Sequence, residues 1–226
     1  MALVKHFLMI TIEKARQHYA AADTAHDFAH VLRVWRLAQR IGRAEGADMA
    51  VLQAATLLHD VARADELRTG VCHAAEGARR ARAVLRAAGH PPAQVEAVAH
   101  AIAAHRFRGD VAPATLEARV LYDADKLDAM GAIGIARAYA IAGLLGQPLW
   151  TPLPADGSAR RGDLSADHSP VREFAVKLHK LRDALHTPTA RAIAQGRHEF
   201  MEQYFARLEQ EVHGVDSVCD GPGSVI

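Results

Sequence analysis

The sequence predicts an all-α protein, because apolar residues recur at helical spacing and turn residues separate the segments that carry it. In "HVLRVWRLAQRIG", one stripe contains Val31, Val34, Trp35, Ala38 and Ile41. No segment alternates apolar and polar residues strongly enough to predict a strand. We expect helices over about 11–22, 28–44, 48–60, 74–88, 92–105, 115–145 and 171–212.

The breaks between these helices fall at turn residues. They are Gly46, Gly70, "GHPP" at 89–92, "RGDVAP" at 108–113 and a long Pro/Gly/Asp-rich loop at 146–170. A loop of that length is uncommon in a compact domain unless it acts as a lid, so a lid-like loop is one interpretation and a solvated insertion is the other. We expect residues 213–226 to form a disordered C-terminal tail.

Length and charge favour a single domain with a small-molecule partner. The 226 residues suffice for one sizeable core, which we place at 1–212. Lys and Arg number 27 against 26 Asp and Glu, and this balance offers no basic field for nucleic acid. Oligomeric state has no signature in the sequence.

Cysteine usage and hydropathy indicate a cytoplasmic protein. Cys72 and Cys219 lie far apart, and the second is in the Gly-rich tail, so a disulfide framework is not expected. The apolar run near the N-terminus is too short for a secretory signal. No stretch approaches the roughly 18 apolar residues of a membrane span. We expect no membrane partner.

The most informative motif is "LLHDVARAD", in which His59 and Asp60 end an apolar, helix-like run. Adjacent helical residues point about 100° apart. Both side chains can therefore converge on one point only beside the helix end. A bound metal ion is one such point.

Other histidines and aspartates extend this constellation. His26 and His30 share a helix face in "HDFAHVLRVW", and Asp123, Asp125 and Asp128 interrupt the apolar segment "VLYDADKLDAMGAIGIAR". A carboxylate in apolar surroundings needs a partner, because an unpaired buried charge is costly. A divalent cation is a sufficient partner. Imidazole and carboxylate ligands together suit Mn, Fe, Co, Ni or Zn better than Ca.

The order His30, His59-Asp60, Asp125 resembles the H…HD…D signature of the HD-domain superfamily of metal-dependent phosphohydrolases. "HDFAHVLRVW", "AATLLHDVAR" and "DADKLDAMGAIGIAR" resemble the small stand-alone bacterial members, as does "TARAIAQGRHEFMEQYFARLEQEV" near the C-terminus. The resemblance covers about 11–212. It implies an orthogonal helical bundle of the HD-domain type, with His30, His59, Asp60 and Asp125 as metal ligands.

The resemblance leaves the number of metal ions open at one or two. "HAAEGARRARAVL" begins at His73 and resembles the HPxxGA segment of two-metal HD phosphodiesterases, with Ala74 in place of the proline. His105 ends a helix where those proteins also supply a ligand, so His73 and His105 are candidates for a second site. His100 lies about 140° from His105 around a helix, so we exclude it from the same ion.

Four further residues are candidates for catalysis or substrate binding. Arg63 stands three after Asp60, where several HD families place a lysine, and its forked guanidinium suits a phosphate. Lys126 could offset a carboxylate or a phosphate. His26 and Asp27 precede His30 by one turn and could orient it or contact substrate. Each also has an ordinary structural explanation, as a surface arginine, an ion pair or a helix cap.

The resemblance implies a phosphomonoesterase or phosphodiesterase that uses a divalent ion, Mn, Fe, Co, Ni, Mg or Zn, on a small phosphate ester such as a nucleotide. The metal would act as a Lewis acid and lower the pKa of a bound water. Two alternatives stay open. One is a di-iron HD-type oxygenase, which requires His73 and His105 as ligands. The other is a non-catalytic nucleotide-binding regulatory module, for which a complete ligand set would be unnecessary.

Overall fold

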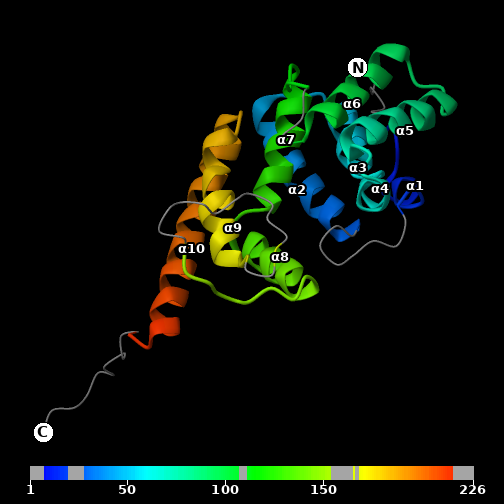
Figure 1. Ribbon diagram of the computed structural model, residues 1–226. Helices are drawn as coiled ribbons and strands as arrows, with labels where there is room; N and C mark the ends of the chain where they lie inside the picture. The colour runs from blue at the N-terminus through cyan, green and yellow to red at the C-terminus, as the bar shows by residue number, and fades with distance from the viewer. Residues whose placement is uncertain (1–7, 20–27, 107–110, 154–164, 166–167, 216–226) are drawn as a thin grey trace, which may run out of the picture.

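The computed structural model describes residues 8–19, 28–106, 111–153, 165 and 168–215, and within these ranges the chain is helical without strands (Figure 1). The elements in chain order are α1 (Ile12–Arg16), α2 (Phe28–Glu45), α3 (Met49–Leu58), α4 (Arg63–Thr69), α5 (His73–Ala87), α6 (Pro92–Ala104), α7 (Leu116–Asp128), α8 (Gly131–Leu144), α9 (Pro170–Val176), η1 (Leu178–Lys180), η2 (Arg182–Ala184) and α10 (Pro188–His213). The all-α prediction is confirmed.

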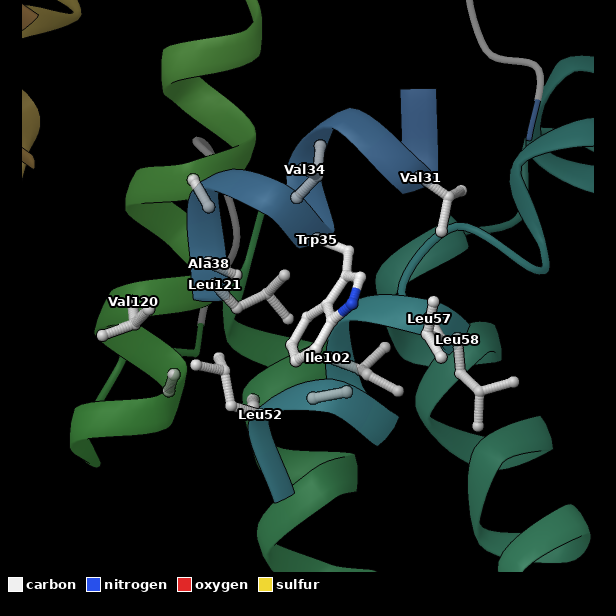
Figure 2. Packing of buried hydrophobic residues seen from close by; sticks show 14 of the residues in the cluster. Val31, Val34, Trp35, Ala38, Leu52, Leu57, Leu58, Ile102, Val120 and Leu121 are labelled. Carbon is white, nitrogen blue, oxygen red and sulfur yellow. The ribbon is translucent and has the colours of Figure 1, made fainter. Parts of the chain in front are cut away.

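Helices α2, α3, α6 and α7 surround the core. Helix α2 packs on α3 and α7, and α6 packs on α3, α5 and α7. The predicted stripe of α2 is buried, and Trp35 points toward Leu52 of α3 and Ile102 of α6 (Figure 2). Burial of one apolar stripe against neighbouring helices is what gives an amphipathic helix most of its stability.

Helix α3 is buried along most of its length, and this explains where the HD dipeptide lies. Asp48 caps its start by accepting hydrogen bonds from the backbone amides of Ala50 and Val51, at 2.9 and 3.2 Å. Every residue from 51 to 58 is buried. A helix that is apolar all round belongs in the interior, so its C-terminal end delivers His59 and Asp60 to the centre of the molecule.

The predicted continuous helix at 115–145 is wrong, because the chain bends by 65° between α7 and α8. Gly131 adopts φ +68°, a left-handed conformation that favours glycine. Gly134 lets the backbone close this bend, since a Cβ there would lie 2.3 Å from the carbonyl oxygen of Ala129. The apolar spacing continues across the junction, so spacing alone did not show the break.

Two further helix predictions need correction. The segment 171–212 is not one helix but α9, two short 3₁₀ turns and then α10, which Thr187 caps through a hydrogen bond from the amide of Ala190. Helix α4 was not expected at all, since it has only seven residues and follows the HD dipeptide almost directly. This helix carries Glu66, which contacts His73.

Several predictions fall partly or wholly outside the described residues. These include much of the lid-like loop at 146–170, the C-terminal residues 216–226, and residues 20–22 of the helix expected at 11–22. The described part of that helix is shorter than expected, because α1 ends at Arg16 and residues 17–19 are not helical. Helix α10 ends at Gly214, which has φ +65°. Within the described part of the chain no single helix is long and apolar enough to cross a bilayer, and only α7 and α8 taken together meet that length and composition.

Candidate metal centre

Three helix regions bring the predicted ligands His30, His59, Asp60 and Asp125 together. His30 Nε2 lies 3.4 Å from His59 Nε2 and 3.4 Å from Asp125 Oδ1. Asp60 Oδ2 lies 3.7 Å from His30 Nε2 and 3.8 Å from His59 Nε2. These side chains come from α2, from the residues that follow α3, and from α7. Such a set of nitrogen and oxygen atoms could hold a divalent metal ion.

A second group of donors lies on the other side of Asp60. His73 Nε2 and His105 Nε2 are 3.2 Å apart, and each lies 3.6 Å from Asp60 Oδ1. His73 begins α5, and His105 follows α6. The two oxygens of Asp60 therefore face different pairs of histidines. This is the arrangement of a carboxylate that could bridge two metal ions.

The hydrogen bonds of the histidines fix which ring nitrogen faces the centre. Each Nδ1 bonds a protein oxygen: His30 to Asp128 at 2.8 Å, His59 to the carbonyl of Thr56 at 2.8 Å, His73 to Glu66 at 2.7 Å and His105 to the carbonyl of Ile102 at 2.6 Å. Carbonyls and ionised carboxylates only accept, so each Nδ1 is assigned the proton and donates it. In the neutral form of each ring, Nε2 would present its lone pair to the centre, as in metal-ligating histidines.

The pKa values of the histidines differ sharply across the centre. Burial, which disfavours the charged ring, lowers the pKa of His59 and of His73 to about 4. Burial acts on His30 as well, but hydrogen bonds to Asp125 and Asp128 outweigh it and raise its pKa to about 9. At neutral pH the metal-free centre therefore holds neutral His59 and His73 beside a protonated His30.

The two central carboxylates stay ionised despite their burial. Burial opposes ionisation of Asp60, but His59 and its neighbours hold the Asp60 pKa well below its usual range. The pKa of Asp125 is also held well below its usual range, because the positive charge of Lys126 outweighs the effect of burial. The Lys126 ammonium lies 2.6 Å from Asp125 Oδ2 and donates to the carbonyl of His105 at 3.0 Å. Lys126 thus pairs with the carboxylate of Asp125, a predicted ligand, and a carboxylate is the first of the two partners considered for Lys126.

The three aspartates of α7 have three different roles. Asp123 accepts hydrogen bonds from the amides of His186 and Thr187 and from the Thr187 hydroxyl, at 2.7 to 2.8 Å, and so holds the start of α10. Asp125 faces the metal centre. Asp128 is 1% exposed and orients His30. Sequence spacing showed that these carboxylates needed partners but not which partner each would find.

Arg63 lies at the outer side of His73 and contacts Glu66 of α4. Its NH1 is also 3.2 Å from His73 Nδ1, and its Nε is buried without a hydrogen-bond partner among the described residues. Arg106 reaches the other oxygen of Glu66 at 3.3 Å. Neither Glu66 nor Arg106 was singled out from the sequence, because the contacts of Glu66 with His73 and with Arg106 join segments that are separate in the chain.

Two of the remaining predicted residues cannot be placed relative to the centre, and His100 makes a contact of its own. His26 and Asp27 lie outside the described residues. His100 accepts a hydrogen bond from the amide of Ala114 at 3.2 Å, which is consistent with its exclusion as a ligand.

This helical frame and its histidine and aspartate cluster define a protein of the HD-domain class. The HD domain family matches residues 27–130, which span α2 to the end of α7. The chain belongs to the HD-domain superfamily, whose solved members include proteins described as HD-superfamily hydrolases.

The chain is also similar to individual members of this superfamily. The uncharacterized protein YpgQ of Bacillus subtilis is 36% identical over 202 residues, covering 86% of this chain and 88% of its own. A crystal structure of YpgQ in complex with ADP is similar with a TM-score of 0.69 and 33% identity, over 91% of this chain and all of that one. A crystal structure of an HD-superfamily hydrolase from Bacillus thuringiensis is similar with a TM-score of 0.69 and 29% identity, over 89% of this chain and 94% of that one.

Proposed function

We propose that this protein is a metal-dependent phosphohydrolase that acts on a small phosphate ester, and that the ester is a nucleotide. The observation that carries the proposal is the convergence of histidine Nε2 atoms and aspartate oxygens in one buried centre. The similarity to YpgQ, which has been crystallised with ADP, supports a nucleotide as the substrate.

The donor set fits divalent metal ions at two positions. His30, His59, Asp60 and Asp125 would hold the first, and His73, His105 and the second oxygen of Asp60 would hold another. The Nε2 atoms of each histidine pair lie 3.4 and 3.2 Å apart, and the lone pairs of two neutral rings would repel each other there unless a cation lay between them. In the metal-free protein the proton on His30 relieves this repulsion in the first pair. Mn, Fe, Co, Ni, Mg and Zn are the candidate ions. A bound divalent ion supplies Lewis acidity and a water of lowered pKa.

The chain's own residues prepare the centre for an anionic substrate. The ionised Asp60 and Asp125 would repel a phosphate, so they need compensating positive charge. Lys126 offsets part of the Asp125 charge through its 2.6 Å contact. Arg63 has a buried Nε without a hydrogen-bond partner among the described residues, and a substrate oxygen would satisfy this donor. These cations would also stabilise charge that develops on phosphoryl oxygens.

The test is phosphate release from a panel of nucleotides and simple phosphoesters, with Mn, Co, Ni or Mg added in turn. We expect metal-dependent hydrolysis by the wild-type protein and a loss of more than about 100-fold in Asp60→Asn, since ligand removal should cost at least as much as removal of an outer partner. Asp65→Asn is the matched control. Asp65 lies five residues further on and pairs with Arg68 and Arg80 instead of the centre.

The same purified protein also distinguishes the phosphohydrolase from two alternatives, a di-iron oxygenase and a non-catalytic regulatory module. Because a second group of donors exists at His73 and His105, a di-iron oxygenase is a specific rival. It would contain about two equivalents of iron as isolated, would consume oxygen with substrate and would release no phosphate. A regulatory module would be stabilised by nucleotide, as thermal unfolding would show, with no product formed.

A further inference from the structure

The outer side of His73 carries a small polar unit that consists of Glu66, Arg63 and Arg106. Glu66 Oε2 lies 2.7 Å from His73 Nδ1 and also contacts Arg63, while Glu66 Oε1 lies 3.3 Å from Arg106. The carboxylate is mostly buried, with 16% of its side chain exposed. A carboxylate with two guanidinium partners has little freedom to move, so the ring that it bonds is held as well.

The same arrangement occurs at the other end of the centre. Asp128 bonds His30 Nδ1 at 2.8 Å and is held by Arg33, at 2.8 Å, and by Arg137, at 2.9 Å. Each candidate metal position thus has one histidine oriented by a carboxylate that two arginines fix. The other two histidines, which follow α3 and α6, bond only backbone carbonyls through Nδ1.

We propose that Glu66 is the positioning residue of the second metal position: it holds His73 with Nε2 toward Asp60, and Arg63 and Arg106 hold Glu66. This inference rests on the two-metal form of the proposed function. A carboxylate on Nδ1 fixes the tautomer, keeps the ring from rotating and raises the basicity of the opposite nitrogen. Glu66 and Asp128 belong to different helices and orient different histidines, so the two positions can be emptied separately.

Removal of the carboxylate should weaken binding of one ion only. Loss of an outer partner of a metal-ligating histidine typically lowers metal affinity about 10- to 100-fold. We expect a reduction of that size for the second equivalent of Mn²⁺ in Glu66→Ala, with the first equivalent unchanged. Glu66→Gln keeps an oxygen that can accept a hydrogen bond from the His73 Nδ1–H group, so the Mn²⁺ affinity of this variant should lie between those of wild type and Glu66→Ala.

Helix α5 offers a matched control. Glu76 also pairs with two arginines, Arg79 at 2.7 Å and Arg80 at 2.8 Å, and the contacts described for it do not include a histidine. Its side chain is 17% exposed, close to that of Glu66. Glu76→Ala therefore removes a similar ion-pair cluster without touching the centre, and both equivalents of Mn²⁺ should bind as in wild type.

The experiment is Mn²⁺ titration of the full-length protein by calorimetry, with electron paramagnetic resonance at two equivalents. Wild type and Glu76→Ala should bind two ions and show the signal of an exchange-coupled pair, because Asp60 would bridge them. Glu66→Ala should bind its second ion at least about tenfold more weakly and show mainly isolated Mn²⁺. Circular dichroism checks that each variant is folded. If Glu66→Ala does not fold, the milder Glu66→Gln replaces it in the titration.

The outcomes separate this inference from the proposed function. Two ions bound with wild-type affinity by the Glu66 variants would overturn the role of Glu66 and leave the two-metal phosphohydrolase intact. A single ion bound by wild type, with phosphate still released, would remove the second position and the Glu66 role together and leave a one-metal enzyme. No phosphate release at any metal loading would overturn the proposed function whatever Glu66 does.

Discussion

His30 and Asp128 are joined by a hydrogen bond of 2.8 Å between Nδ1 and Oδ2, although 98 residues separate them in the chain. The bond connects the start of α2 to the last residue of α7. It turns the other nitrogen of His30 toward His59 and Asp125. The packing of α2 on α7 therefore sets the geometry of the first candidate metal position.

Asp128→Asn should weaken the first metal position. The amide cannot supply the negative charge that supports His30, and it also loses charge-assisted bonds to Arg33 and Arg137. We expect affinity for the first equivalent of Mn²⁺ to fall about 10- to 100-fold. Calorimetric titration measures this directly. Unchanged affinity would show that Asp128 is a purely structural partner.

Asp123→Asn, on the same helix, should change stability instead of metal binding. Asp123 accepts three hydrogen bonds at the start of α10, and an amide nitrogen there would face backbone donors. We expect a loss of about 1–3 kcal/mol in the free energy of unfolding. Urea unfolding gives this value, and Mn²⁺ affinity provides the contrast with Asp128→Asn. A variant as stable as wild type would contradict the role of Asp123 in holding the start of α10.

Metal binding should release a proton from His30. Its pKa of about 9 in the metal-free protein means that the ring is protonated at pH 7 and must become neutral to bind a metal. Affinity at the first position should therefore rise with pH by up to about tenfold per unit and level off above about pH 9. Calorimetry in buffers of different ionisation enthalpy counts the protons. If metal binding released no proton between pH 7 and 8, His30 could not be protonated in the metal-free protein.

Gly134→Ala should destabilise the bend between α7 and α8. A Cβ at this position would lie 2.3 Å from the Ala129 carbonyl oxygen, so the backbone must shift, at a cost of about 1–3 kcal/mol. Gly143, in the same helix, has nothing within 4 Å of an added Cβ. Gly143→Ala should be neutral or stabilising by up to about 1 kcal/mol. Thermal unfolding of both variants tests the difference, and equal stabilities would argue against the close contact.

The helical fold could be predicted from the sequence where the pattern is local. The stripe of α2 and the apolar length of α3 depend only on nearby residues, and both are buried as expected. The bend at Gly131 could not be predicted in the same way. Its neighbours on both sides have helical spacing, and only the approach of the chain to Ala129 explains the need for glycine at 134.

The same distinction between local pattern and distant contact applies to the candidate site. The HD motif and the family resemblance singled out the histidines and aspartates, and the structure places His30, His59, Asp60 and Asp125 together. Their orienting partners were not found, because a hydrogen bond such as His73 to Glu66 depends on how the short helix α4 folds back over α5. Residue spacing shows which face a side chain occupies but not which side chain will meet it there.

The central claim is that phosphate release depends on metal held at this centre. The most direct measurement is nucleotide hydrolysis by protein that has been stripped with a chelator and then titrated with Mn²⁺. We expect no phosphate release from the stripped protein, and activity that returns with added metal and reaches its maximum near two equivalents. Phosphate release by the stripped protein at the rate of the metal-loaded protein would contradict it.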